Sequence, residues 1–363
     1  MPTPHSPQTH VAGEAKRPTS TWVGRRLAGL ALVAGLAGAC GLSDNEQARM
    51  NLHYENSRDF HNRGSWLQAL DQANKALALD EDLLFMQLIR GDCLVKLGKQ
   101  RDEPSMMDEG LDLLSSLCRG PGEESHNAWL ALGRAHVARS LLNDAEVGRI
   151  ERRLASDFLD PTGRAEEEAW LARETEAEIE HLRAAESALR RVLAFELQGD
   201  NLDALVDLVV VLNRQGGRQD EAIETAQRAV ELLIESNALT RRMLQNDQGL
   251  SSEGKLALQR RVDANLDKEW QLRDIIVTIE YNRGALQAAL NALDAVEDRQ
   301  LMRPEQYLNR AGIHERLHND ELAVSDLEQF LAARARVSQF DAVAAEIYDR
   351  IAALQARSEA DAR

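Results

Sequence analysis

Residues 126–136 read HNAWLALGRAH, and this stretch decides the fold. Its spacing is W-x2-L-G-x2-H, supplied by Trp129, Leu132, Gly133 and His136. Small residues between the large ones allow a second helix to approach closely, because little side-chain volume keeps the two backbones apart. The stretch therefore predicts a helix that packs tightly against a neighbour.

This spacing resembles the first helix of a tetratricopeptide repeat, a family built from stacked helix–turn–helix units of about 34 residues. A segment resembling the second helix of such a repeat lies at 64–79, where the key residues are Gly64, Trp66, Ala69, Ala76, Leu77 and Leu79. The seven-residue step from Ala69 to Ala76 returns to the same helical face. The resemblance implies an all-α chain of helical hairpins that stack into a solenoid.

The same pattern recurs along the chain. Gly91, Leu94 and Gly98 fit a first helix, and an irregular second helix is expected near 104–118. Further units are marked by Leu205, Leu208, Val209 and Leu212 before a Gly216-Gly217 turn, by Ala222, Ala226 and Ala229, more weakly by Gly284 and Ala289, and by Tyr307, Ala311, His314, Ala323, Leu327 and Phe330. A helix at about 338–356 would cap the array, since a solenoid needs a polar outer face at its end.

The expected fold is a tetratricopeptide-like helical-hairpin solenoid over residues 48–333, with a capping helix and tail at 334–363. Two regions depart from the repeat, 140–197 with a loop around Asp160–Gly163, and 233–280 with a loop near 245–252. They predict elongated or inserted helices. The alternative is a generic helical bundle with alanine-rich seams.

The N-terminal residues have the three parts of a secretory signal. Residues 1–26 are polar and end in a cationic cluster, and residues 27–39 read LAGLALVAGLAGA. This apolar run is too short to span a bilayer, which takes about 20 residues. Leu36 to Cys40 resembles a bacterial lipobox, in which the cysteine is lipidated and becomes the mature N-terminus.

The resemblance implies a signal peptide at 1–39, lipid on Cys40 and a tether at 40–47. Because Gly41 follows the cysteine, it also implies an outer-membrane lipoprotein facing the periplasm rather than the inner membrane or cell surface. An uncleaved anchor, an ordinary signal peptide with a chance cysteine, and a twin-arginine signal at Arg25-Arg26 are the alternatives.

Composition restricts the partners. The whole chain carries a net charge of −17, and removal of residues 1–39 leaves 39 basic and 59 acidic residues, a net of −20. Nucleic acids and anionic lipids, which need positive potential, are therefore not expected as general partners. Cys93 and Cys118 could pair in an oxidising compartment, but two buried free thiols are the favoured interpretation.

His314-Glu315-Arg316-Leu317-His318 matches H-E-x-x-H, in which two histidines one helical turn apart can hold zinc. The charged Arg316 departs from the metalloprotease pattern. The repeat also explains His314 as a packing residue and puts His318 in the turn between two helices. A zinc hydrolase is therefore a minor alternative, and no catalytic residue, metal or cofactor is expected.

The first helices of stacked repeats line a concave groove, and the resemblance assigns eight residues to it. These are Tyr54, Arg58, Asn62, Arg134, Asn213, Arg214, Glu305 and Arg316. Guanidinium groups suit carboxylates, so we expect a groove for an extended or helical peptide of acidic character. The alternative is that these arginines are solvated and offset neighbouring carboxylates.

The predicted function is a non-enzymatic, lipid-anchored scaffold or adaptor of the bacterial cell envelope that binds other proteins or peptides. A subunit of an outer-membrane assembly, pilus or secretion machine is the main alternative. Fold resemblance does not choose between these pathways.

Overall fold

The computed structural model describes residues 42–156, 158–195, 201–246, 249–298, 302–335 and 342–361, and all regular secondary structure in these ranges is helical. The helices are α1 (Asp44–Asn62), α2 (Trp66–Leu77), α3 (Leu84–Arg101), α4 (Pro104–Cys118), α5 (His126–Leu154), α6 (Pro161–Phe195), α7 (Leu202–Arg214), α8 (Gln219–Asn246), α9 (Ser252–Asn282), α10 (Leu286–Asp298), α11 (Pro304–Arg316), α12 (Asp320–Ala335) and α13 (Ala342–Asp361). None of these helices combines the length and the apolarity needed to cross a bilayer. The predicted signal peptide and Cys40 lie outside the described residues.

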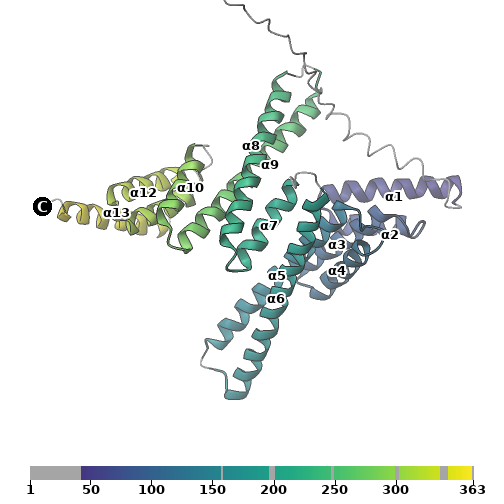
Figure 1. Ribbon diagram of the computed structural model, residues 1–363, viewed down its shortest axis with the longest axis horizontal. Coiled ribbons are helices and arrows are strands. Elements are labelled where there is room, and N and C mark those ends of the chain that lie inside the picture. Colours follow the sequence, from purple (N-terminus) through teal and green to yellow (C-terminus); the bar gives the residue numbers. More distant parts are fainter. Residues whose placement is uncertain are drawn as a thin grey trace, which may run out of the picture.

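Consecutive helices pair into hairpins, from α1–α2 at one end of an elongated array to α11–α12 near the other (Figure 1). The first helices of neighbouring hairpins also touch, α1 with α3, α3 with α5, α5 with α7 and α7 with α9. At the C-terminal end α13 packs on α12 and buries Ile347, Ile351 and Leu354. This arrangement confirms the predicted solenoid of helical hairpins with a capping helix.

Small residues set the spacing within the hairpins. Ala69, Ala73 and Ala76 of α2 are completely buried. Between α3 and α4 the fit is closer still, because a Cβ atom on Gly110 would lie 2.7 Å from the carbonyl oxygen of Gly91. Such a separation leaves no room for a side chain, so these helices meet backbone to backbone.

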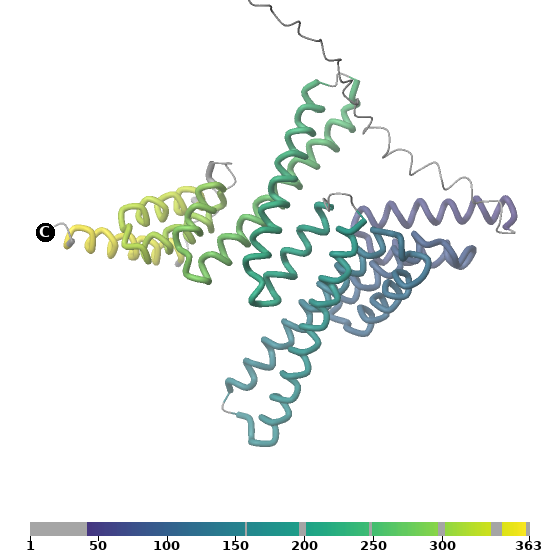
Figure 2. Tube along the Cα trace, in the orientation of Figure 1, coloured from purple at the N-terminus to yellow at the C-terminus, as the bar shows by residue number. Residues whose placement is uncertain are grey.

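Four helices, α5 and α6 of one hairpin and the neighbouring α8 and α9 of two consecutive hairpins, are much longer than the rest. Helices α5 and α6 have 29 and 35 residues, and α8 and α9 have 28 and 31. Their outer parts leave the array in opposite directions (Figures 1 and 2). We call residues 140–181 the α5–α6 arm and residues 236–266 the α8–α9 arm. These arms account for the two irregular regions seen in the sequence, although the first loop is shorter than predicted because Pro161 already begins α6.

The N-terminal helix begins earlier than the sequence indicated. Ser43 caps α1, since its hydroxyl accepts a hydrogen bond from the Glu46 amide while the Glu46 carboxylate accepts one from the Ser43 amide at 2.9 Å. This reciprocal pair is a capping box, which starts a helix firmly. The predicted tether of residues 40–47 is therefore wrong in its second half, which is helical from Asp44.

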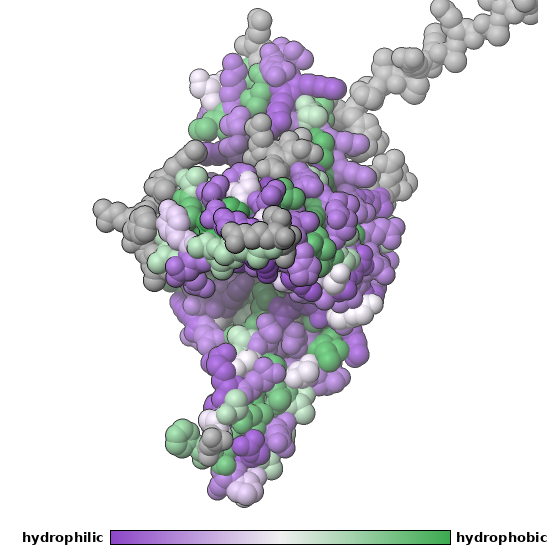
Figure 3. Space-filling model, turned by 90° about the vertical axis from the view of Figure 1, so that its left-hand side faces the viewer, coloured by the Kyte–Doolittle hydropathy of each residue, from purple (hydrophilic) through white to green (hydrophobic). Residues whose placement is uncertain are grey.

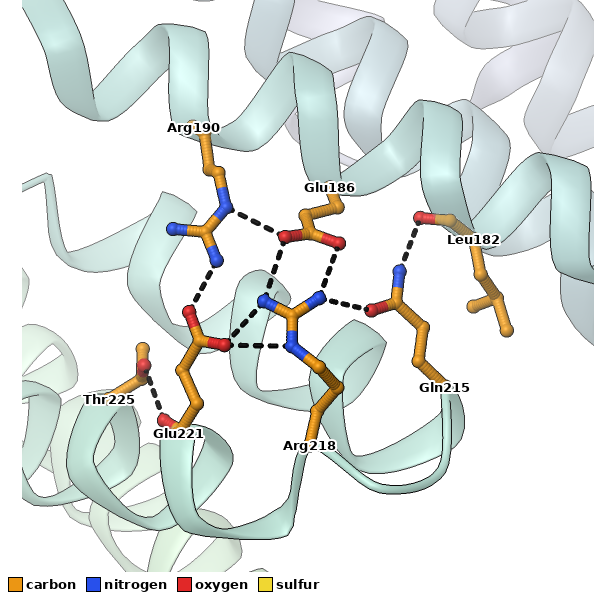
Figure 4. Close-up of polar contacts among 7 residues, drawn as sticks. All are labelled: Leu182, Glu186, Arg190, Gln215, Arg218, Glu221 and Thr225. Atoms are coloured by element: carbon orange, nitrogen blue, oxygen red, sulfur yellow. Dashed lines mark hydrogen bonds and ion pairs between the residues drawn. The ribbon is translucent and has the colours of Figure 1, made fainter.

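A network of ion pairs joins α6 to α8 across the turn after α7 (Figure 4). Gly216 and Gly217 make this turn with φ angles of 65° and 66°, a backbone region that favours glycine. Arg218 then binds Glu186 through two contacts of 3.1 Å, and Arg218 and Arg190 both bind Glu221. Burial alone would raise the pKa of Glu186, but hydrogen bonds from Arg218 and Arg190 lower it to about 2.

Cys93 and Cys118 are free thiols, and both are buried. Burial raises the pKa of each thiol to about 12. Of the two possibilities left open by the sequence, the structure has the buried thiols rather than the disulfide.

Candidate interaction groove

A hollow of about 390 Å³ lies near the C-terminal end of the array, between the first helices α9 and α11 and the capping helix α13. It is lined by Val277, Thr278, Tyr281, Leu308, Asn309, Gly312, Ile313 and Arg350. The walls combine aliphatic side chains with an aromatic ring, an amide and a guanidinium group. This mixture suits a ligand that buries an apolar side chain and hydrogen-bonds at its edges.

Gly312 keeps the hollow open. A Cβ atom at this position would meet only Arg350 Nη2, at 3.7 Å, which is an ordinary contact distance. The Arg350 guanidinium is held in place by Glu315, to whose Oε1 atom its Nε donates at 2.6 Å. Arg316 lies 4.8 Å above the centre of the Tyr281 ring, within the range of a cation–π contact. The edges of the hollow are thus positioned by the protein itself.

A strip of alternating charge crosses the first helices towards the middle of the array. Arg134 of α5 donates to Asp207 of α7 at 2.6 Å and lies 3.7 Å from Asp203. On the other side, Lys268 of α9 binds Asp203 at 2.7 Å. Each step of the strip joins two hairpins, so it stabilises their stacking as well as giving the surface its polarity.

The pKa values of the two carboxyl groups in this strip, Asp203 and Asp207, shift in opposite directions. Burial would raise the pKa of Asp203, but Lys268 and Arg134 together lower it. Burial does raise the pKa of Asp207, because it outweighs the opposing effect of Arg134. Asp203 is thus approached by two cations, Arg134 and Lys268, whereas Arg134 is the cation bound to Asp207.

The strip continues to α11. Arg303, just before that helix, binds Asp267 at 2.7 Å and lies 3.7 Å above the Trp270 ring. The Trp270 indole in turn donates to Gln306 at 2.9 Å. These contacts connect the strip with the first turn of the helix that lines the hollow.

The eight residues predicted for the groove all lie on first helices, α1, α5, α7 and α11. Arg134 belongs to the charged strip, and Arg316 borders the hollow. Glu305 is exposed in the first turn of α11, and Asn213 is half-buried on α7.

Arg214 corrects the prediction of free groove arginines. Its side chain is only 17% exposed and binds Glu178 of α6 at 2.7 Å and Asp144 of α5 at 3.3 Å. The guanidinium therefore clamps three helices together. Arg134 is likewise engaged, so for these two residues the alternative interpretation, in which arginines offset neighbouring carboxylates, describes the structure better.

On α1 the predicted residues form a separate group. The Tyr54 ring packs against Phe85 of α3 with ring centres 5.6 Å apart, and Arg58 pairs with Glu55 at 2.5 Å. Asn62 is exposed at the end of the helix. These residues lie at the far end of the array from the hollow and do not contribute to it (Figure 1).

No protein-family model and no curated protein matches this sequence. Among solved structures, the chain is similar to that of MamA protein at 15% identity, over 70% of this chain and 97% of that one, with a TM-score of 0.36. It is also similar to a tetratricopeptide repeat protein from Parabacteroides merdae ATCC 43184 at 12% identity, over 83% and 97% of the two chains, with a TM-score of 0.33. Values this low say nothing of function, and the fold rests on the hairpins themselves.

The fold is a tetratricopeptide-like solenoid. In such an array the first helices share one face, which is where the hollow and the charged strip both lie. A second hollow of about 750 Å³ lies at the loop end of α2 and α4, but it is lined mainly by the ends of second helices and is more open to solvent. The hollow on the first helices is therefore the stronger candidate.

None of the eight residues that line the hollow was assigned to the groove from the sequence. Tyr281 lies near the end of α9, most of which falls in a region that departs from the repeat pattern, and Arg350 belongs to α13, which was predicted only as a capping helix. Asn309 has no feature in the sequence that sets it apart from other polar residues of the repeats. The one available signal was the proximity of Asn309 to Gly312 on α11, since a glycine inside a helix often marks a close approach or a space.

The HERLH segment does not have the helical geometry of the zinc motif. Helix α11 ends at Arg316, and His318 follows it with a φ of 58°, so the two histidines do not share a helical face. Glu315 is occupied by Arg350, while His314 is 12% exposed and faces Asp326 at 3.8 Å. Among the described residues, no group of three or more histidine, cysteine or carboxylate side chains is arranged to hold a metal ion.

Proposed function

We propose that this protein is a scaffold or adaptor of the bacterial cell envelope, held to the membrane by lipid on Cys40, that binds other proteins through its first-helix face. The hollow between α9, α11 and α13 is the observation that carries the binding role. The cationic, apolar and small residues that end at Cys40 support the anchor. By the lipobox resemblance, the outer membrane facing the periplasm is the proposed location.

The hollow favours a peptide with one apolar anchor side chain. Val277, Leu308 and Ile313 supply the apolar wall. Arg316 and Arg350 lie at its edge, where their free N–H groups can donate to backbone carbonyls or to acidic side chains of the peptide. We therefore keep the expectation of an acidic peptide for this end of the groove. We do not extend it to Arg214, whose charge is used inside the fold.

A photo-crosslinking residue in place of Asn309 tests the binding role in membranes that contain the full chain. We expect one or a few protein partners to be captured, and the same crosslinker at Gln329, exposed on the second helix α12, to capture none of them. Gly312→Trp should fill the hollow and abolish capture. Gly312→Ala is the matched control and should preserve it, because space exists for its methyl group.

Equal capture by the Gly312→Trp and Gly312→Ala proteins would contradict a binding role for the hollow, provided that both have the helical circular dichroism of the wild type. The anchor is tested separately. Cys40→Ser should move the protein from the membrane pellet to the soluble fraction, and retention in the pellet would refute lipid anchoring.

The chain could instead be a subunit of an envelope machine for outer-membrane assembly, pilus formation or secretion. The long arms favour this alternative, since they present surface well outside the groove (Figure 2). A subunit would co-purify with its partners in fixed stoichiometry after mild detergent extraction. An adaptor would exchange them, and the partners would be recovered only after crosslinking.

A further inference from the structure

The two arms carry opposite charge. The α5–α6 arm, residues 140–181, has twelve acidic residues and five Lys or Arg, whereas the α8–α9 arm, residues 236–266, has five basic and three acidic residues. The arms also leave the array in opposite directions (Figure 1). Complementary surfaces thus stand at opposite sides of one molecule, where they cannot reach each other within that molecule.

The glutamates of the α5–α6 arm lie on two opposite faces of α6, of which one faces the protein and the other faces solvent. Inside the hairpin, Glu167, Glu174 and Glu178 turn towards α5 or α7 and bind Arg153, Asn143 and Arg214. On the opposite face of α6, Glu168, Ala172, Glu176 and Glu180 follow one another at intervals of four residues, and all are exposed. Ala165, Ala169 and Ile179 complete this face, which we call the α6 stripe. None of its glutamates forms an ion pair within the described part of the chain.

The basic arm combines unpaired charge with exposed apolar side chains. Arg242 and Arg260 lie on its outer faces and form no ion pair among the described residues. Beside them Leu239 is 62%, Met243 42% and Leu256 50% exposed. Figure 3 shows hydrophobic side chains interrupting the hydrophilic surface of both arms. Leu239 and Met243 lie one turn apart on α8, and exposed apolar side chains grouped in this way are typical of a contact surface.

The α5–α6 arm has little core of its own. Among its described residues Ile150 is the sole buried aliphatic side chain, and contacts such as Asn143 with Glu174 at 2.6 Å join the two helices. A hairpin this long and this polar adds little to the stability of the array, because it removes little apolar surface from water. The length of the α5–α6 arm is better explained by binding of a partner to its outer surface.

We propose that the α6 stripe of one copy binds the outer face of the α8–α9 arm of a second copy. The alanines of the stripe allow close helix packing, its glutamates face Arg242 and Arg260, and Ile179 lies against the exposed Leu and Met side chains. Because two different surfaces meet, each contact leaves one arm free on both partners. Such head-to-tail contacts produce a closed ring or an open chain of copies. This assembly does not depend on the groove or on the lipid anchor.

The matching charge on the same chain favours a second copy over other occupants of the basic arm. Anionic lipid would also attract Arg242 and Arg260, but it would leave the α6 stripe without a role and would be repelled by it. The chain as a whole is acidic, which likewise opposes adsorption to an anionic surface. Binding to lipid is therefore the competing outcome that the experiment must be able to reveal.

Charge reversal on each arm tests the contact, with sedimentation velocity of the full chain as the measurement. We expect wild-type protein to associate as its concentration rises, and the association to weaken about tenfold when NaCl is raised from about 50 to about 500 mM. Glu168→Lys with Glu176→Lys, and separately Arg242→Glu with Arg260→Glu, should each give monomers. An equal mixture of these two variants should associate again, because each supplies the charge that the other has lost.

Glu123→Lys with Glu124→Lys is the control, since it makes the same change of charge at exposed positions outside the arms. It should associate like the wild type. Wild-type protein that stays monomeric at low salt, or variants whose mixture stays monomeric, would overturn the proposal. So would a monomer that binds phosphatidylglycerol vesicles through Arg242 and Arg260 without any effect of the α6 substitutions.

Discussion

Glycines in this chain serve two opposite purposes at the scale of single residues, and the space around each one distinguishes them. Gly110 lets α4 touch the backbone of α3, so its missing side chain is required by packing. Gly312 borders an open hollow, so its missing side chain is not required by anything within the fold. A glycine inside a helix lowers stability relative to alanine, and such a cost without a packing reason points to a binding role.

Gly312→Ala should stabilise the protein by about 0.5–1 kcal/mol, because alanine restricts the unfolded chain and favours the helix. Urea unfolding followed by circular dichroism measures the change. A loss of stability would mean that the hollow around this residue is smaller than the structure has it.

His136 and His181 give the chain a dependence on pH. Their Nδ1 atoms are 3.0 Å apart between α5 and α6, with Arg139, Asp108 and Glu180 as the charged neighbours. Burial and the second histidine lower the pKa of His136 to about 4, and burial and Arg139 lower that of His181. Both histidines are therefore neutral in the folded protein at pH values where the unfolded chain already binds protons.

The stability from this pair should be complete above pH 6.5 and should fall as pH drops from 6.5 towards about 4. From pH about 7.5 to about 5 we expect the wild type to lose on the order of 1–2 kcal/mol more than His136→Asn. Urea unfolding at both pH values measures this difference. Equal losses in the two proteins would show that the histidine is solvated in the folded state.

At the scale of helices, the pair α3–α4 shows how close packing fixes a hairpin. Gly110→Ala places a Cβ atom 2.7 Å from both the Gly91 carbonyl oxygen and a methyl group of Val95, so the helices must separate. We expect a loss of about 1–3 kcal/mol, although alanine is the better helix former. Chemical denaturation beside Gly312→Ala provides the comparison. The two substitutions are chemically identical and should have opposite signs.

Helices are also the scale at which sequence reasoning succeeded best. The irregular second helix predicted near 104–118 is α4, Pro104–Cys118. The turn at Gly216-Gly217 was predicted because two adjacent glycines are typical of a turn. The direction and length of the arms could not be predicted, because polar contacts such as that of Asn143 with Glu174 join their helices in place of a regular apolar pattern.

The candidate site was harder to predict than the fold. Arg134 was recognised as a first-helix residue, but its partners Asp203 and Asp207 are about seventy positions away and carry no pattern that links them to it. Arg214 was predicted on the correct helix, but its ion pairs with other helices were not predicted. Whether an arginine is free or clamped depends on carboxylates from other hairpins, which only the packing of the whole array brings near.

The whole molecule has a series of local cores instead of one centre. Ala311, Phe330 and Leu354 form a cluster at the C-terminal end, separate from the clusters around α3–α5 and α7–α9. In such arrays stability is a sum of unit and neighbour contributions, so damage at one end stays near that end. The hollow lies in the last third of the array, where it depends on the capping helix.

Leu354→Ala should cost about 2–4 kcal/mol in the C-terminal cluster, since it empties a buried aliphatic position. Hydrogen exchange should then accelerate in α11, α12 and α13 while α1–α6 keep their protection. Uniform acceleration across the chain would mean that the array unfolds as a single cooperative unit.

The capping box at Ser43 limits the distance between the first helix and the proposed lipid anchor. With lipid on Cys40 as proposed, only three residues separate the anchor from the first helical residue, Asp44. An extended chain reaches at most about 3.6 Å per residue, so the distance from Cys40 to Asp44 is at most on the order of 14 Å. The N-terminal end of the array would then stay close to the bilayer surface. Copies at that surface would meet in two dimensions with their N-terminal ends facing the same way, so weak contacts between arms would act as if at a much higher concentration.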